Sequence, residues 1–447
     1  MNQKKWLRAF LFATIIVVLL LAGIFIYASG HYNPDNLELT GASATTPPNT
    51  TAPIVYPSPD IVLPTNTPAP TPEPTPTPFP EYDINLLAVG DNLLHMGIVN
   101  TGRQSDGSYN FDFLFENLKP FLNEAEIKII NQETILGGNY LGFSGYPTFN
   151  SPTEVGDAIA KAGFNVVLHS SNHTTDKGME GLLNCVDFWR ENHPDVLVCG
   201  ISDPAAEYNI PLITIEDYTF AVLNYTYSPN SMVLKNEYMG YLDMLCNYDR
   251  ETGAIDFTTL NPKVIEDIKL AKTLADVVIV CPHWGTEYQT MPSRYQEKFA
   301  LQMAEAGADL IIGTHPHVPQ PVEWLDGIDG HRTLCYYSLG NYVSTQKQSI
   351  CMLEGMAWVT FHVTETGIKL TEDNTGVLPL VCHYNSGPVR LENVYPLEEY
   401  TEEMALRHGI WKYGEVPIHL EELQGYSNEI FGEMVLTVAD ILSNTTK

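Results

Sequence analysis

Two histidines flank a single proline in the segment LIIGTHPHVPQP, residues 310–321, at the end of a short apolar run. In an extended strand, side chains two residues apart point to the same face. The pattern therefore predicts that the imidazoles of His315 and His317 converge on one point. Convergent imidazoles at the end of a buried strand are typical of a metal site. The alternative interpretation is a pair of ordinary loop histidines.

Ligand-type residues also follow four other apolar runs, in the segments AVGDNLL, INQET, SSNHTTD and CPHWGTEY. These residues are Asp91, Asn131, Glu133, Asn172, His173 and His283. Each residue alone also fits a turn, a helix cap or a packing role. Because α/β sheets place ligand and catalytic groups at the carboxyl ends of strands, we expect these residues to join the histidine pair. A set of carboxylate, amide and imidazole groups suits Zn, Mn or Fe better than Ca or Mg alone.

Apolar strands alternate with amphipathic helices through most of the chain after residue 83. The expected strands cover residues 84–90, 125–133, 164–173, 276–285 and 309–318. The expected helices cover residues 151–163, 176–192, 261–275 and 293–308. This alternation predicts an α/β domain whose sheets are buried on both faces. The later runs 332–343 and 356–370 lack intervening helices, which indicates antiparallel strands, and the acidic tail from about residue 384 is expected to complete the domain.

The N-terminal region has the pattern of a membrane anchor. A short basic segment, residues 1–8, precedes an uncharged apolar run at residues 9–30. About 20 apolar residues suffice to span a bilayer, and basic residues on one side favour the cytoplasm for that side. We therefore expect a transmembrane helix with its N-terminus in the cytoplasm, and a cleaved signal peptide is the alternative. Either reading places the remainder of the chain outside the cytoplasm.

Residues 31–82 are rich in proline and threonine, which predicts an extended, disordered linker. The linker leads to the expected extracellular domain at residues 83–447. The formal net charge of −31 argues against a nucleic-acid partner, because phosphate contacts need clustered lysine and arginine. The seven cysteines form no C-x-x-C pair, and several lie in apolar runs. We therefore expect buried free thiols rather than a disulfide framework or a zinc knuckle.

Seven segments between about Ile84 and Val343 carry a specific resemblance. In chain order they are LLAVGDNLL, NQET, GYPTFNSPTEVGDAIAKAGFNVV, SSNHTTDKG, PHWGTEY, GTHPHVPQP and YSLGNYV. This region resembles the CapA family of capsule-synthesis (poly-γ-glutamate) proteins, which have a calcineurin-like metallophosphoesterase fold. The resemblance implies an α/β/β/α sandwich of two mixed sheets, here preceded by the transmembrane helix and the linker.

The same resemblance implies roles for the site residues. It implies one or two divalent transition-metal ions (Mn, Zn or Fe), held by Asp91, Glu133, Asn172, His283, His315 and His317. His173 would face the substrate and donate a proton or stabilise charge. Asn131, Glu287 and Asn341 would support the ligands or contact the substrate. The chain departs from the superfamily at Leu93, where the first motif has a histidine, and His95 is either a substitute ligand or an ordinary loop histidine.

Two functions are compatible with these expectations, and a third reading is an exported α/β domain with a degenerate site. The first is a membrane-anchored extracellular protein of capsule synthesis that hydrolyses a phosphoester or an amide bond with a metal-activated water. The second is a non-catalytic component that binds polymer or serves as a scaffold in a capsule synthesis and export complex. His173 favours the first, because a tether has no use for a proton donor. The expected partners are an anionic cell-envelope polymer or its precursor, the membrane through the N-terminal helix, and other capsule-synthesis membrane proteins.

Overall fold

The structure, a computed structural model, describes residues 79–202, 204, 209–413 and 418–443. The predicted basic segment 1–8, the predicted anchor 9–30 and most of the predicted linker 31–82 lie outside these residues. Among the residues described, no helix combines the length and the apolar character needed to cross a membrane. The described residues all belong to the unit Pro76–Lys447.

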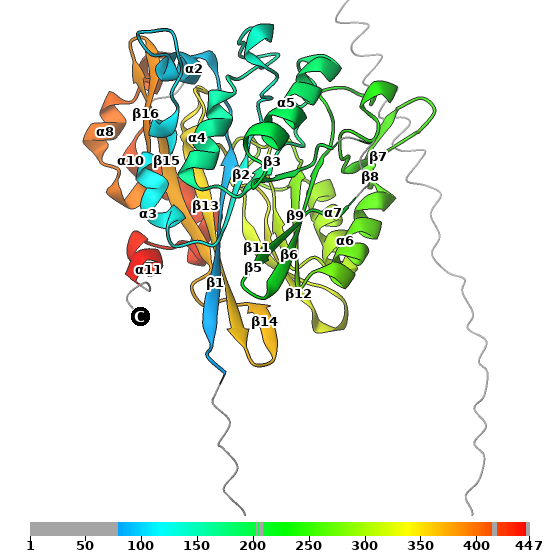
Figure 1. Cartoon of the computed structure of the whole chain (residues 1–447). Coiled ribbons are helices and arrows are strands. Elements are labelled where there is room, and N and C mark those ends of the chain that lie inside the picture. The colour runs from blue at the N-terminus through cyan, green and yellow to red at the C-terminus, as the bar shows by residue number, and fades with distance from the viewer. Residues whose placement is uncertain (1–78, 203, 205–208, 414–417, 444–447) are drawn as a thin grey trace, which may run out of the picture. The chain divides into compact units, whose positions relative to one another are not determined.

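The larger of two mixed sheets contains the first predicted strands (Figure 1). Its strand order is β16 (Val389–Pro396), β15 (Gly376–Ser386), β13 (Leu353–Thr364), β1 (Tyr82–Asp91), β2 (Ile127–Asn131), β3 (Val166–Leu168) and β4 (Leu197–Cys199), and β14 (Gly367–Leu370) pairs with β13. The strands β1 to β4 are parallel, whereas β13 to β16 pair antiparallel. Strand β1 joins the two halves, because it pairs parallel with β2 and antiparallel with β13.

The second sheet has a parallel centre and antiparallel edges. Its order is β11 (Val322–Asp326), β12 (Arg332–Tyr336), β10 (Leu310–Ile312), β9 (Val277–His283), β6 (Tyr218–Thr226) and β5 (Leu212–Ile215). The prediction of an antiparallel strand in 332–343 is therefore only half right, since β12 is antiparallel to β11 but parallel to β10. A separate hairpin consists of β7 (Cys246–Tyr248) and β8 (Ile255–Leu260).

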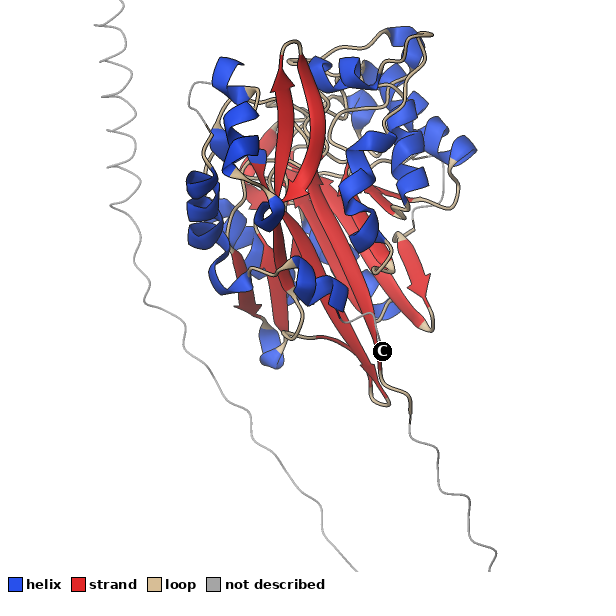
Figure 2. Ribbon diagram, turned by 90° about the vertical axis from the view of Figure 1, so that its left-hand side faces the viewer, coloured by secondary structure: helices blue, strands red, loops and turns tan. Residues whose placement is uncertain are grey.

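The two sheets pack face to face between layers of helices (Figure 2). The domain has one hydrophobic core between the two sheets and another between the sheets and the helices. Neighbouring side chains of a strand point to different cores: Ile129 of β2 packs towards the second sheet, whereas Ile130 packs with the helices. Phe220 of β6 meets Phe361 of β13 across the interface, with ring centroids 5.3 Å apart. This period-two division is that of stacked sheets. The predicted α/β fold with two mixed sheets is confirmed.

The predicted helices are present, each within three residues of its expected bounds. The helices are α2 (Met96–Gly102), α3 (Lys119–Leu122), α4 (Glu154–Ala162), α5 (Gly178–Asn192), α6 (Pro262–Leu274), α7 (Arg294–Ala306), α8 (Glu402–Arg407), α9 (Ile410–Tyr413), α10 (Leu420–Phe431) and α11 (Val438–Leu442). Local signals explain the accuracy for α7: Ser293 and Gln296 form a capping box, and Gly307 ends the helix with a φ of 109°.

All seven cysteines are free and buried, as predicted.

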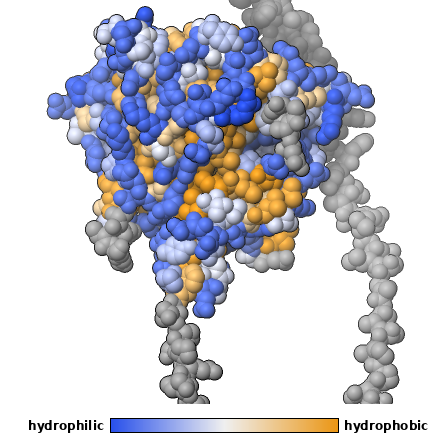
Figure 3. Space-filling view, in the orientation of Figure 1, coloured by the Kyte–Doolittle hydropathy of each residue, from blue (hydrophilic) through white to orange (hydrophobic). Residues whose placement is uncertain are grey.

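The surface of the domain is mainly polar. Polar side chains cover most of the face drawn in Figure 3, and apolar side chains gather over β5 and β6, where Leu212 is 39% exposed. Single exposed apolar residues are normal for a protein surface and need no functional explanation.

Candidate metal centre

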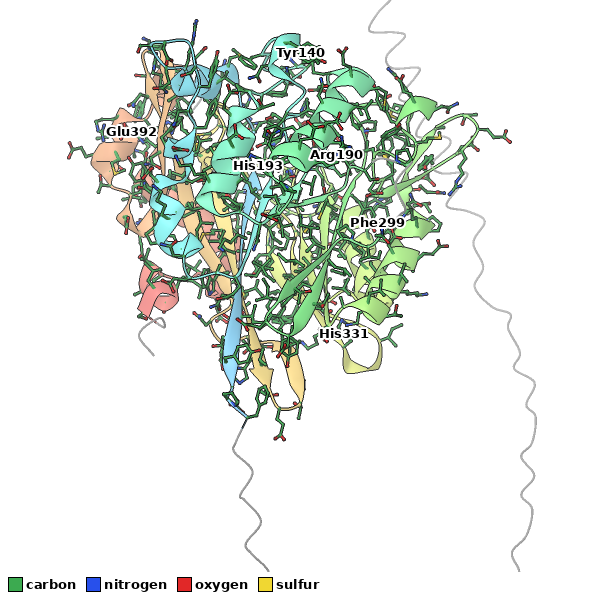
Figure 4. The ribbon with its side chains drawn as sticks, viewed as in Figure 1. Tyr140, Arg190, His193, Phe299, His331 and Glu392 are labelled. Atoms are coloured by element: carbon green, nitrogen blue, oxygen red, sulfur yellow. The ribbon has the colours of Figure 1, made fainter. Side chains whose placement is uncertain are left out.

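The carboxyl ends of the parallel strands bring the predicted site residues together. These ends point towards the part of the molecule where Tyr140 lies, and His331 marks the opposite end (Figure 4). Asp91 and His283 are the last residues of β1 and β9, and Glu133 follows β2 by two residues. Because these strands belong to both sheets, the site lies where the two sheets meet.

Glu133, His315 and His317 form the closest cluster of possible ligands. One ligand atom from each side chain lies within 4.8 Å of the others, and all three residues are buried. Both carboxylate oxygens of Glu133 and Nδ1 of His315 lack a hydrogen-bond partner in the described part of the chain. Leaving such groups buried and unpaired is costly unless a cation or another partner satisfies them. The donor set therefore fits a divalent ion with mixed nitrogen and oxygen ligands.

The histidine pair converges for a different reason from the predicted one. The prediction of a strand over 309–318 is wrong beyond Ile312, where β10 ends. His315 and His317 have φ angles of 98° and 60°, in the left-handed region, so strand periodicity does not apply to them. Their ring centroids are 5.7 Å apart. The strained backbone of this loop, a feature that clusters at functional sites, is what aims both rings inward.

Asp91 anchors that loop and one of its rings. The backbone N–H of His315 lies 3.3 Å from each carboxylate oxygen of Asp91, and Nδ1 of His317 lies 3.1 Å from Oδ2. Asn131 donates from Nδ2 to Asp91 Oδ1 at 2.8 Å. The same Nδ1 of His317 also lies 3.1 Å from Oδ1 of Asn341, and Nδ2 of Asn341 donates to the His317 carbonyl at 3.0 Å.

The electrostatic field at the cluster is negative. Burial by itself lowers the pKa of His317, but the carboxylates of Glu133 and Asp91 raise it to about 9. Burial raises the pKa of Glu133 well above its ordinary value. The carboxylates that raise the pKa of His317 would likewise stabilise a metal cation in this cluster.

His283 and Asn172 form a second pair of possible ligands, in contact with each other beside the cluster. Nε2 of His283 lies 2.8 Å from Oδ1 of Asn172, and its Nδ1 lies 3.0 Å from the Thr314 hydroxyl. The rings of His283 and His315 are 4.8 Å apart. Burial lowers the pKa of both histidines well below the ordinary value, which favours the neutral form that binds metal.

His173 faces the centre, and its ring is oriented by Asp176, a residue that the sequence analysis did not single out. Its Nδ1 lies 2.7 Å from Oδ2 of Asp176, and its Nε2 lies 3.9 Å from Oε1 of Glu133. Asp176 also accepts the backbone N–H of Phe149 at 2.6 Å, and the Phe149 ring contacts that of His173 at 4.7 Å. The spacing of three residues in SSNHTTD was the available signal for this pair.

A cavity of about 370 Å³ opens beside the centre. It is lined in part by Leu93, His95, His173, Glu287 and His317. His95 is not among the three residues whose ligand atoms converge; its Nδ1 accepts the backbone N–H of Thr345 at 3.4 Å, and burial lowers its pKa to about 4. Glu287 is exposed, whereas Asn341 is fully buried behind His317.

A larger cavity of about 710 Å³ lies elsewhere. It is lined by residues of β4, β5, β6, β7 and α6 and of the nearby loops, and by none of the predicted site residues. The candidate site is identified by buried ligand groups that converge without hydrogen-bond partners, and not by the size of the cavity.

The fold and the cluster define an α/β sandwich protein with a buried carboxylate–imidazole centre at its strand ends. Residues 85–346 match the family model described as "Bacterial capsule synthesis protein PGA_cap". This match covers more than half of the chain, and the protein belongs to that family. The resemblance to capsule-synthesis proteins found in the sequence is confirmed.

Two curated relatives carry related names. The chain is 31% identical over 222 residues to the PGA biosynthesis protein CapA of Bacillus subtilis (strain 168), covering 49% of this chain and 51% of that protein. It is 29% identical over 283 residues to the capsule biosynthesis protein CapA of Bacillus anthracis, covering 61% and 62%. The chain thus spans about half to three-fifths of the length of these relatives.

Solved structures show only distant likeness. A putative 5'-nucleotidase from Staphylococcus aureus matches with 18% identity and a TM-score of 0.41, covering 67% of this chain and 54% of that one. The sulfate thiohydrolase SoxB of Thermus thermophilus matches with 13% identity and a TM-score of 0.33, covering 70% and 45%. Both TM-scores are below 0.5, too low to support a functional argument.

Proposed function

We propose that the protein is a metal-dependent hydrolase of capsule synthesis that cleaves a phosphoester or an amide bond. The observation that carries the proposal is the pair of Glu133 carboxylate oxygens, buried without a hydrogen-bond partner beside His315 and His317. The names of the CapA relatives support the capsule role.

Glu133, His315 and His317 would hold the ion, with Asp91, Asn172 and His283 around them. Manganese, zinc and iron all suit this donor set. A bound divalent ion polarises the bond to be cleaved and lowers the pKa of a water so that it can attack at neutral pH. A metal site needs ligands of fixed orientation. Contacts with Asp91 and Asn341 fix the orientation of the His317 ring. The contact with Asn172 fixes the orientation of the His283 ring.

His173 is the proposed general acid. The Asp176 carboxylate binds Nδ1, which leaves Nε2 directed at Glu133 and the cavity. In the reaction, the Nε2 proton would pass to the leaving oxygen of a phosphoester or the leaving nitrogen of an amide. The Phe149 ring against His173 limits the access of bulk water on that side.

We further propose that the apolar run at 9–30 anchors this domain outside the cell, close to an anionic cell-envelope polymer or its precursor and to other capsule-synthesis membrane proteins. The length of the run and the basic residues before it support this location. A non-catalytic polymer-binding or scaffold role is the second candidate, and Leu93 in place of the superfamily's histidine is the observation that favours it.

The test is turnover by the full-length chain purified in detergent. The protein would be stripped with a chelator, reloaded separately with Mn, Zn or Fe, and assayed on bis(p-nitrophenyl) phosphate and on γ-glutamyl p-nitroanilide. Turnover that requires the ion and is lost in His173→Gln, with metal content unchanged, supports the hydrolase. Bound metal with no turnover of either substrate class would favour the scaffold role.

A further inference from the structure

Lys347 is the only lysine or arginine among the described residues that line the cavity beside the centre. We propose that Lys347 determines specificity by binding an oxyanion of the substrate, a carboxylate or a phosphate, next to the bond that is cleaved. The inference rests on the proposed function, because it assigns a substrate group to the same site.

The residue before Lys347 is held by hydrogen bonds at several atoms. The Gln346 side chain accepts from Nδ2 of Asn341 at 2.8 Å and donates to the Tyr288 hydroxyl at 3.2 Å. Its backbone N–H donates to the Ser344 hydroxyl at 3.0 Å, and its carbonyl accepts from the Tyr384 hydroxyl at 3.0 Å. A lysine that follows such a residue has a fixed Cα position, unlike a lysine on a mobile surface loop.

The same hydrogen bonds tie this loop to the metal centre. Asn341, which donates to Gln346, also contacts both the ring and the carbonyl of His317. Tyr288, which accepts from Gln346, donates its backbone N–H to the Pro316 carbonyl at 2.8 Å. Gln346 and the His315–His317 loop are therefore joined by hydrogen bonds, and Lys347 is the next residue along the chain from Gln346.

The charge of Lys347 is not neutralised by the protein. Within the described part of the chain no acidic side chain pairs with it, although the protein has 54 acidic and 23 basic residues. An exposed cation without an acidic partner at the cavity attracts an anionic group to that position. Glu287 is the only carboxylate among the described residues that line the cavity, and it opposes this attraction, as does the buried Glu133 carboxylate of the centre.

Aromatic rings provide the remaining contact surface. Tyr146 and Tyr288 line the cavity and are 79% and 41% exposed. Exposed rings at a cavity rim pack against the chain of a substrate while a charged group fixes its position. The arrangement suits a substrate that carries its oxyanion on an extended chain.

The test compares binding to the full-length chain in detergent with a chelator present, so that no metal contributes. The probes are N-acetylglutamate for the carboxylate, glycerol 1-phosphate for the phosphate, and the neutral amide of N-acetylglutamine. Titration calorimetry would be run on the native chain, Lys347→Gln, Lys347→Arg, and the control Lys269→Gln, which alters an exposed lysine of α6 that does not line the cavity.

Lys347→Gln should weaken binding of an anionic probe about tenfold, as expected for loss of one charge-assisted hydrogen bond. Lys347→Arg should restore it, and Lys269→Gln should not change it. Selective loss for N-acetylglutamate would identify a carboxylate, and selective loss for glycerol 1-phosphate a phosphate. Equal affinity of native and Lys347→Gln chains, or no binding of either anionic probe to the native chain, would overturn the inference. Because the readout needs neither metal nor turnover, a failure of this inference can be distinguished from a failure of the hydrolase proposal.

Discussion

Oδ1 of Asn172 lies 2.8 Å from Nε2 of His283, and this contact joins the two sheets of the sandwich. Asn172 follows β3 of the larger sheet, and His283 ends β9 of the second sheet. Asp91 of β1 makes the same kind of link when it accepts the backbone N–H of His315. The candidate centre is therefore a product of sheet packing and not of any single segment.

The first prediction concerns metal content. Replacement of His315 and His317 together by alanine should abolish binding of one ion per chain, because it removes two of the three convergent ligand groups. Elemental mass spectrometry on the purified full-length protein measures the stoichiometry. His362→Ala, which alters an exposed histidine paired with Asp83, is the control and should keep the metal. Unchanged metal in the double variant would remove the pair from the ligand set.

The second prediction separates chemistry from metal binding. His173→Ala should lower turnover by about 10² to 10⁴, the usual contribution of a general acid. Asp176→Asn should lower it about 10- to 100-fold, because Nδ1 of His173 loses the carboxylate 2.7 Å away. Both variants should retain the ion, since the ligand cluster does not include them. Full activity in His173→Ala would exclude it as the proton donor.

The third prediction tests the close packing behind Asp91. A Cβ on Gly90 would lie 2.0 Å from the carbonyl oxygen of Gly340, which itself accepts the Asp91 N–H at 2.9 Å. Gly90→Ala should therefore lower the free energy of unfolding by about 3 kcal/mol, as overpacked cores do. Urea unfolding measures the change.

Gly425, within α10, is the control glycine for the Gly90→Ala experiment. A Cβ there meets nothing within 4 Å, so Gly425→Ala should raise stability by about 0.5–1 kcal/mol through helix propensity. If both alanines had the same effect, steric contact at Gly90 would not be the cause.

The fourth prediction concerns acid stability. Nε2 of His408 donates to the Cys382 carbonyl, and Nδ1 accepts the N–H of Ile410, each at 3.0 Å, which requires a neutral ring. Burial lowers the His408 pKa to about 3, whereas an unfolded histidine has a pKa of about 6.5. Below pH 6.5 the unfolded chain thus binds a proton that the folded chain does not. Stability should fall from this source as the pH drops from about 6.5 towards 3.

His408→Gln keeps one donor and one acceptor but cannot titrate. Its free energy of unfolding, measured in urea at pH 7.5, 5.5 and 4.5, should fall less steeply than that of the native chain. The difference should approach about 1.4 kcal/mol per pH unit well below pH 6.5. Parallel curves for the two proteins would show that His408 is protonated in the folded state.

Local sequence patterns predicted helices and strands well where capping residues or apolar runs determine them. The capping residues Ser293 and Gln296 define the start of α7, and the apolar run at 84–90 forms most of β1. The rule that ligands gather at carboxyl strand ends predicted a common location for Asp91, Glu133 and His283, and in the structure each lies at or just after the carboxyl end of a strand.

Long-range contacts explain what the sequence did not reveal. Gly313, just after β10, lies against the neighbouring segment: its N–H donates to the Tyr336 carbonyl, and an added Cβ would lie 2.1 Å from the Tyr337 carbonyl oxygen. The left-handed backbone at His315 likewise accompanies a long-range contact, since the His315 N–H meets the Asp91 carboxylate. The parallel pairing of β12 with β10 likewise depends on which strand lies beside it, and no local pattern encodes a neighbour.

The ligand groups of the centre are widely spaced along the chain, since Asp91 and His317 are 226 positions apart. A chain that grows from its N-terminus therefore has no complete ligand set until His317 has been synthesised and both sheets have docked. Under the proposed function, ion uptake would therefore require a completely folded domain. A truncated or partly folded molecule would remain metal-free, so the ion content of a preparation would report its fraction of fully folded molecules.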